Sequence, residues 1–522
     1  MKTNKALLAA AAAAAAAGCT GDKTVQQPNI VFLLFDDLGY GDLGCYGQEK
    51  IETPHIDALA AQGLLFTDMY SAAPISGPSR CCIMTGKHMG HSQIRDNQSH
   101  YRDFPPMPGE ENLGWNRVFV HTEQQGQQPM LSGTETIGAM MQKAGYKTAL
   151  VGKWGLGYPG SESTPNKMGF DYFYGFVCQA LAHTYYPTSL WENDKVIETG
   201  NEFVMQGKPL PEGLDPMDIA SYRQYNSQFY GPDLMYDKLE KFIVENAGGP
   251  FMAMWMTTVP HSAVQAPEEE VMYYVHKLGD EQPIVDGGRY LPNRYPLATY
   301  AAMVTHIDTQ VGMLVAKLKE LGIWENTIFI VTSDNGPASN ENSPMEHFQS
   351  GGPFSCAEGW GKFSLHEGGI RMPFVVSWGD RYKGVKTDHI AGFADLMPTF
   401  ADLAGMEAPE NDGISFAPIL AGKPGQQKEH PYLYWEYPGS DGWVAVRKGE
   451  WKGLLQKVGK GNGTMELYNL ASDPRETADV SAEHPEIVAA MWEAVRESHE
   501  TCPIEIPKFN MDIPYPEDGK QE

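Results

Sequence analysis

Apolar runs of strand length recur along this chain, and each ends at polar residues. Residues 29–35 read NIVFLLF and stop at an Asp-Asp pair, and similar runs at 147–151, 251–258 and 327–332 also stop at polar residues. Runs of this kind are typical of strands buried on both faces of a sheet. Helix signals lie between them, as at residues 53–61. This alternation predicts an α/β fold with a large, mainly parallel central sheet flanked by helices.

Composition limits the partners of the chain. Its 522 residues are 42% hydrophobic, which is ample for a large packed core. The formal net charge of −27 argues against binding to nucleic acid and to anionic membrane surfaces, because both would be repelled at long range. An anionic substrate must therefore be captured by a few local cations.

The N-terminus predicts export. Residues 1–19 combine early lysines, a Leu/Ala run too short to span a bilayer, and Ala-Ala-Gly-Cys ending at Cys19. This segment resembles a bacterial lipoprotein signal peptide, so Cys19 would be lipidated and residues 20–28 would form a tether. An ordinary secretory signal is the alternative. Both place the protein outside the cytoplasm, in the periplasm or at the outer membrane or cell surface, touching a membrane only through a lipid anchor. The other cysteines are scattered and predict neither a zinc site nor a disulfide framework.

The pattern changes beyond about residue 425. Short strand-like runs separated by turn residues are followed by an amphipathic helical pattern at 483–500. We therefore expect a main domain at 29–425 and a smaller C-terminal α+β subdomain of antiparallel sheet plus helix at 426–522. The strand-like runs are residues 432–437, 442–447, 451–456 and 465–470.

Polar residues follow the apolar runs where the strands of a parallel sheet would share one edge. Ligands bind at that edge in open α/β folds, so these side chains should converge. The Asp and Asn side chains among them form an all-oxygen set that favours one calcium or magnesium ion. Turn or helix-cap roles are the structural alternative for either pair. The residues are Asp36, Asp37, Lys153, His261, Asp334 and Asn335.

The stretch SGPSRCCIMTGK at residues 76–87 predicts a helix with Ser76 at its N-terminus, facing the cation. Arg80, one turn later, would hold the nucleophile or neutralise metal-bound oxygens. An ordinary helix start that happens to carry Ser and Arg is the alternative.

These motifs together carry a family resemblance. SGPSRCCIMTGK closely resembles the signature of the type I, formylglycine-dependent sulfatases of the alkaline phosphatase superfamily. NIVFLLFDDLGYGD, GYKTALVGKWGLG, VPH, TSDNG and KFSLHEGGIRMP resemble further family landmarks in family order, over roughly residues 28–480. The resemblance implies an alkaline phosphatase-like fold.

The resemblance also implies residue roles. Ser76 would be oxidised to formylglycine (3-oxoalanine), whose hydrate attacks the sulfur of a sulfate ester. Because the precursor is serine, a radical S-adenosylmethionine sulfatase-maturing enzyme would be the partner in biosynthesis. Arg80 would support the formylglycine, Lys153 and Lys362 would bind sulfate oxygens, and His261 would protonate the leaving alcohol. One Ca2+ would be bound by Asp36, Asp37, Asp334 and Asn335.

One position departs from the family pattern. The family usually has a histidine two residues after the active-site lysine, whereas this chain has Gly155. We hypothesise that His183 fills the vacated space. The alternative is a histidine packed between its neighbours Tyr185 and Tyr186.

The expected substrate is a sulfated glycan of host or algal origin, desulfated at a chain end of an oligosaccharide. Candidate sugar contacts are Arg95, Asn97, His183, Trp435 and Glu436, for which ordinary loop packing is the alternative. Two rival functions are a phosphatase or phosphodiesterase of the same superfamily with unmodified Ser76, and a surface lipoprotein that binds sulfated glycans without turnover.

Overall fold

The computed structural model describes the chain except residues 1–26, 100–111, 121, 341–342, 356 and 517–522. The predicted signal peptide, Cys19 and residues 20–26 of the tether lie outside the described residues. Within the described part, no helix combines the length and the apolar character that crossing a membrane requires.

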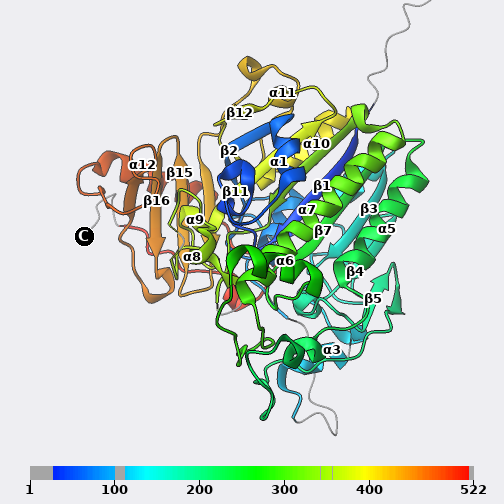
Figure 1. Ribbon diagram of the computed structural model, residues 1–522. Coiled ribbons are helices and arrows are strands. Elements are labelled where there is room, and N and C mark those ends of the chain that lie inside the picture. Colours follow the sequence, from blue (N-terminus) through cyan, green and yellow to red (C-terminus); the bar gives the residue numbers. More distant parts are fainter. Residues whose placement is uncertain (1–26, 100–111, 121, 341–342, 356, 517–522) are drawn as a thin grey trace, which may run out of the picture.

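A large twisted sheet forms the centre of the molecule (Figure 1). Its strand order is β12-β2-β11-β8-β1-β7-β3-β4-β5-β6, and β13 pairs with β2. Strand β1 pairs in parallel with both β7 and β8, whereas β11 is antiparallel to β2 and β8. The mainly parallel α/β sheet is therefore confirmed. Its strands are β1 (Asn29–Asp36), β2 (Leu64–Tyr70), β3 (Lys147–Lys153), β4 (Tyr172–Phe176), β5 (Ser189–Glu192), β6 (Lys195–Glu198), β7 (Phe251–Pro260), β8 (Thr327–Ser333), β11 (Arg371–Trp378), β12 (Val385–Thr387) and β13 (Ala391–Gly392).

Helices cover both faces of this sheet. In β1, Val31 and Leu33 pack with the helices of one face, and Phe32 and Leu34 pack with those of the other. Both faces of the strand are buried, which explains its unbroken apolar sequence. The first face carries α1 (Pro54–Ala61), α5 (Gly231–Asn246), α6 (Glu268–Leu278) and α7 (Pro296–Glu320); the second carries α2 (Ser76–Thr85), α4 (Ile137–Lys143) and α10 (Leu396–Ala404).

A smaller antiparallel sheet lies beside the large one, shown in orange in Figure 1. Val488, Met491 and Val495 of its helix pack against the sheet, which confirms the amphipathic pattern in the sequence. Its elements are β14 (Leu433–Tyr437), β15 (Trp443–Lys448), β16 (Trp451–Gln456), β17 (Glu466–Asn469) and α12 (Pro485–Ser498). The remaining short elements are α3 (Arg117–Val120), β9 (Ser339–Asn340), β10 (Ser343–Pro344), α8 (Met345–Phe348), α9 (Glu367–Ile370) and α11 (Ala417–Leu420).

Candidate active site

Acidic and amide side chains meet at one edge of the central sheet. Asp36 ends β1 and Asp37 follows it, and Asp334 and Asn335 follow the neighbouring strand β8. The Asn335 Nδ2 donates to Asp37 Oδ1 at 2.7 Å, and the Asp37 backbone N–H donates to Asp334 Oδ1 at 3.2 Å. All four residues are at most 3% exposed. The expected convergence of these strand ends is confirmed.

Ser76 is the first residue of α2 and faces this group. Its Oγ donates to Asp36 Oδ1 at 2.9 Å and lies 3.5 Å from Asn335 Oδ1. The side chain is almost completely enclosed, with 2% of the residue exposed. The helix that begins here places the hydroxyl among the carboxylates, as the sequence predicted.

Three cations surround the same group. Lys153, the last residue of β3, places its Nζ 2.6 Å from Asp36 Oδ2 and 3.1 Å from Ser76 Oγ. Arg80 donates to Asp334 Oδ2 through Nε and Nη2 at 3.1 and 2.9 Å. Lys362, from the loop before α9, donates to Asp37 Oδ2 at 2.7 Å.

Burial and neighbouring charges set the protonation of these groups. Burial, followed by the charge of Asp36, raises the pKa of Asp334 to about 6. Burial alone would raise the pKa of Asp36 as well, but Lys153 and the other cations hold it well below its usual range. Crowded buried carboxylates with an amide oxygen form the donor set that calcium or magnesium favours, so the residues fit a divalent ion.

Two histidines lie beside this cluster. His261 follows β7 directly, and its Nε2 lies 3.5 Å from Asp37 Oδ2. The His183 ring lies 4.7 Å from the His261 ring, centre to centre, and its Nδ1 contacts the Ala180 carbonyl at 2.8 Å. Burial lowers the pKa of both imidazoles, well below the usual range for His183.

The side chain of Gln179 lies next to Gly155, and the sequence alone did not indicate this residue. A Cβ at Gly155 would lie 3.1 Å from Gln179 Oε1, whereas His183 packs against His261 instead. Gln179 is therefore the side chain nearest to Gly155, and a role for His183 in the vacated space stays a prediction. Gln179 is 8% exposed, and its buried Oε1 has no hydrogen-bond partner in the described structure. Only the three-dimensional neighbourhood of Gly155 identifies this residue.

The expected sugar contacts divide into two groups. Arg95 and Glu436 are fully buried and form an ion pair with each other. Trp435 is 2% exposed and donates through Nε1 to the Ser71 carbonyl. The prediction that these three residues contact substrate is wrong, because their polar groups bind inside the protein. Asn97 is only partly buried and accepts a hydrogen bond from the Gly77 backbone, next to Ser76.

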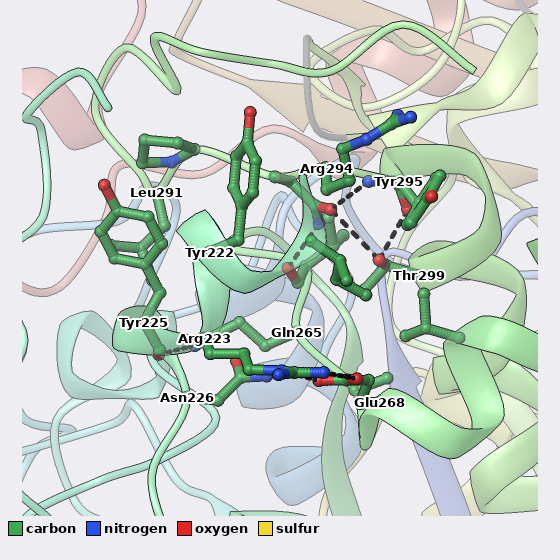
Figure 2. Close-up of a pocket in the computed structure, with 16 residues that line it drawn as sticks. Tyr222, Arg223, Tyr225, Asn226, Gln265, Glu268, Leu291, Arg294, Tyr295 and Thr299 are labelled. Atoms are coloured by element: carbon green, nitrogen blue, oxygen red, sulfur yellow. Dashed lines mark hydrogen bonds and ion pairs between the residues drawn. The ribbon is translucent and has the colours of Figure 1, made fainter. Parts of the chain in front are cut away.

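A separate small pocket lies between residues 219–226, the loop after His261 and the start of α7 (Figure 2). Its charged groups are paired: Arg223 lies against Glu268, and Arg294 binds Asp280. None of the predicted catalytic residues lines it. The predicted chemistry therefore does not belong to this pocket.

The fold and the site together define a hydrolase of the alkaline phosphatase-like superfamily. Residues 28–406 match the sulfatase family, and residues 358–501 match the C-terminal region of N-sulphoglucosamine sulphohydrolase. The chain therefore belongs to the sulfatase family and is a sulfuric ester hydrolase.

Several known proteins are similar over most of the chain. An N-acetylgalactosamine-6-O-sulfatase of Bacteroides thetaiotaomicron is 28% identical over 520 residues, which cover 90% of this chain and 92% of that protein. An N-acetylgalactosamine-6-sulfatase of Rattus norvegicus is 30% identical over 435 residues, covering 82% and 72% respectively. The solved structure of Ps i-CgsB in complex with k-i-k-neocarrahexaose has 25% identity and a TM-score of 0.67, covering 92% of this chain and 94% of that one.

Proposed function

We propose that this protein hydrolyses sulfate monoesters on carbohydrates, using a formylglycine made from Ser76 and one calcium ion. The observation that carries the proposal is the position of the Ser76 hydroxyl, 2.9 Å from Asp36 Oδ1 and 3.1 Å from Lys153 Nζ. Asp36, Asp37, Asp334 and Asn335 would hold the calcium ion.

When present, formylglycine would provide a hydrated aldehyde as nucleophile, and calcium would supply a charge that attracts sulfate oxygens. The chain's own residues position the ester. Lys153 and Lys362 would neutralise sulfate oxygens. Their ammonium groups already contact Asp36 and Asp37, two of the proposed calcium ligands, so they lie where the sulfate would bind. Arg80 holds Asp334 with two donors and binds the Lys153 carbonyl at 2.9 Å, which fixes both residues relative to Ser76.

His261 would give a proton to the leaving alcohol. Its Nδ1 lies 2.5 Å from the Ser262 carbonyl, so Nδ1 carries a proton and Nε2 is the atom that exchanges one with the substrate. The superfamily phosphatase alternative calls for several histidines around two zinc ions. Within the described residues, His261 is the one histidine that lies close enough to Asp36 and Asp37 to share a metal ion with them. A single histidine beside these oxygen ligands favours calcium over zinc.

A glycan substrate is supported by the relatives. Two relatives are named as N-acetylgalactosamine 6-sulfatases, and one solved structure is a complex with k-i-k-neocarrahexaose. The net charge of −27 disfavours binding within a long polyanion, so we place the action at chain ends of oligosaccharides. Export, lipidation of Cys19 and a serine-type radical S-adenosylmethionine maturase complete the proposal.

Co-expression with such a maturase tests it. Mass spectrometry should show the Ser76 peptide lighter by the mass of molecular hydrogen, and the purified protein should release sulfate from at least one monosulfated sugar. Ser76→Ala, produced identically, should release none. A matured, calcium-loaded protein that cleaves phosphate esters but no sulfated sugar would refute the proposal. Binding of sulfated glycans without turnover would support the surface-lipoprotein alternative.

A further inference from the structure

An aromatic wall lies next to His261. We define it as the rings of Trp115, His183 and Tyr290. The His183 ring is stacked on Tyr290 at 5.7 Å and meets the edge of Trp115 at 5.8 Å, centre to centre. These residues come from segments far apart in the chain, and the fold gathers them beside a proposed catalytic residue.

Arg289 adds a positive charge to the aromatic wall. Its guanidinium carbon lies 4.5 Å from the centre of the Trp115 ring, and the residue is exposed. No carboxylate of the described residues forms an ion pair with it, whereas Arg294 nearby pairs with Asp280. A stacked guanidinium keeps its hydrogen-bond donors free at the ring edges. In a chain of net charge −27, a cation beside the site that pairs with no carboxylate of the described residues is available for an anion.

The aromatic wall also offers a defined acceptor. The contact of His183 Nδ1 with the Ala180 carbonyl requires the proton on Nδ1, which leaves Nε2 as an acceptor in the neutral ring. Burial keeps the His183 imidazole neutral by lowering its pKa. Aromatic faces with one acceptor match a sugar ring, which has an apolar face and hydroxyl donors.

We propose that the aromatic wall and Arg289 form a subsite for the sugar next to the sulfated one, and that Arg289 binds a second anionic group on that sugar. The preferred substrate is then a sulfated oligosaccharide with a further negative charge, either a uronic acid carboxylate or a second sulfate. This inference rests on the proposed function and extends it to the substrate class.

The test compares matched sulfated oligosaccharides whose neighbouring sugar is neutral, carries a carboxylate, or carries a second sulfate. We expect the matured protein to prefer at least one acidic form by about tenfold in kcat/KM, the size of one charge-assisted contact. Arg289→Gln should remove that preference by raising KM for the acidic form, with kcat little changed. Arg289→Lys should keep part of it. The carboxylate and sulfate arms identify which anion is bound.

Arg223→Gln is the matched control, because Arg223 is equally surface-exposed but pairs with Glu268 in the separate pocket. It should leave the preference unchanged. Calorimetric binding of the same oligosaccharides to Ser76→Ala protein tests the subsite without turnover, so loss of the proposed activity would not obscure the result. Equal affinity of that protein for neutral and acidic forms, or an equal effect of Arg289→Gln on both, would overturn the subsite.

Discussion

Lys153 bridges Asp36 and Ser76, with its Nζ 2.6 Å from Asp36 Oδ2 and 3.1 Å from Ser76 Oγ. Burial lowers the pKa of this ammonium group, although Asp36 partly offsets the effect. The lysine thus lies where a negatively charged sulfate ester would meet the residue at position 76.

Replacing Lys153 tests this relationship. We expect Lys153→Met to lower kcat/KM by about 10²–10³-fold, because a preorganised charge is lost in a site that excludes water. Lys153→Arg should fall between Met and wild type, since it keeps the charge but not the geometry. Steady-state sulfate release measures the effect, and circular dichroism checks the fold. Activity of Lys153→Met close to wild type would contradict the assignment.

Calcium should stabilise the folded protein through the oxygen cluster. At free calcium about one hundredfold above Kd, the free energy of unfolding should rise by about 2.7 kcal/mol. Thermal unfolding with chelator and with added calcium measures this increase. Asp37→Asn should weaken the response, while Asp441→Asn, an exposed residue paired with Lys460, should keep it. A melting temperature that does not respond to calcium in wild type would exclude the site.

Gln179 should affect activity more than stability. Its Oε1 is buried without a partner, so Gln179→Met, which keeps the side-chain volume, removes a polar group that contributes no described hydrogen bond to folding. We expect unchanged or slightly higher thermal stability and a drop in kcat/KM of about tenfold, the loss of one substrate hydrogen bond. Gln62→Met, at an exposed position, is the control. Full activity would show that Gln179 only fills space.

His306 should make stability depend on pH. It lies between Asp233 at 2.7 Å and Glu270 at 2.8 Å, linking α7 to α5 and α6. Burial alone would lower the pKa of His306, but the hydrogen bonds to both carboxylates outweigh it and raise the pKa from 6.5 to about 9. The protonated form is therefore favoured in the folded state. Its stabilisation is complete below pH 6.5 and is lost as the pH rises through about 9.

Denaturant unfolding across this range, with His306→Gln for comparison, measures the effect. The stability difference between wild type and variant should be largest below pH 6.5, should shrink between pH 6.5 and about 9, and should stay small above that. A difference that is constant with pH would contradict the assignment.

The sequence predicted the part of the site that follows from buried strands. Asp36 ends β1 and Asp334 directly follows β8, and both faces of each strand are buried. Parallel pairing then brings their ends to one edge. The roles of these residues in catalysis stay predictions.

The sequence could not separate surface polar residues from buried pairs. Arg95 and Glu436 are 341 positions apart, and only the packing of β14 against the segment after α2 brings them together. Likewise, nothing in the stretch around Gln179 shows that Gly155, in the segment after β3, leaves room for its amide. Tertiary contacts between distant segments decide both cases.

The near-complete enclosure of Ser76, 2% exposed at the start of α2, has a consequence for timing. Another enzyme cannot reach a hydroxyl that is already packed between the central sheet and its covering helices. Any covalent change there must occur on the nascent or unfolded chain, before the sheet closes around it. A molecule that folds before this change takes place would keep an unmodified serine at position 76.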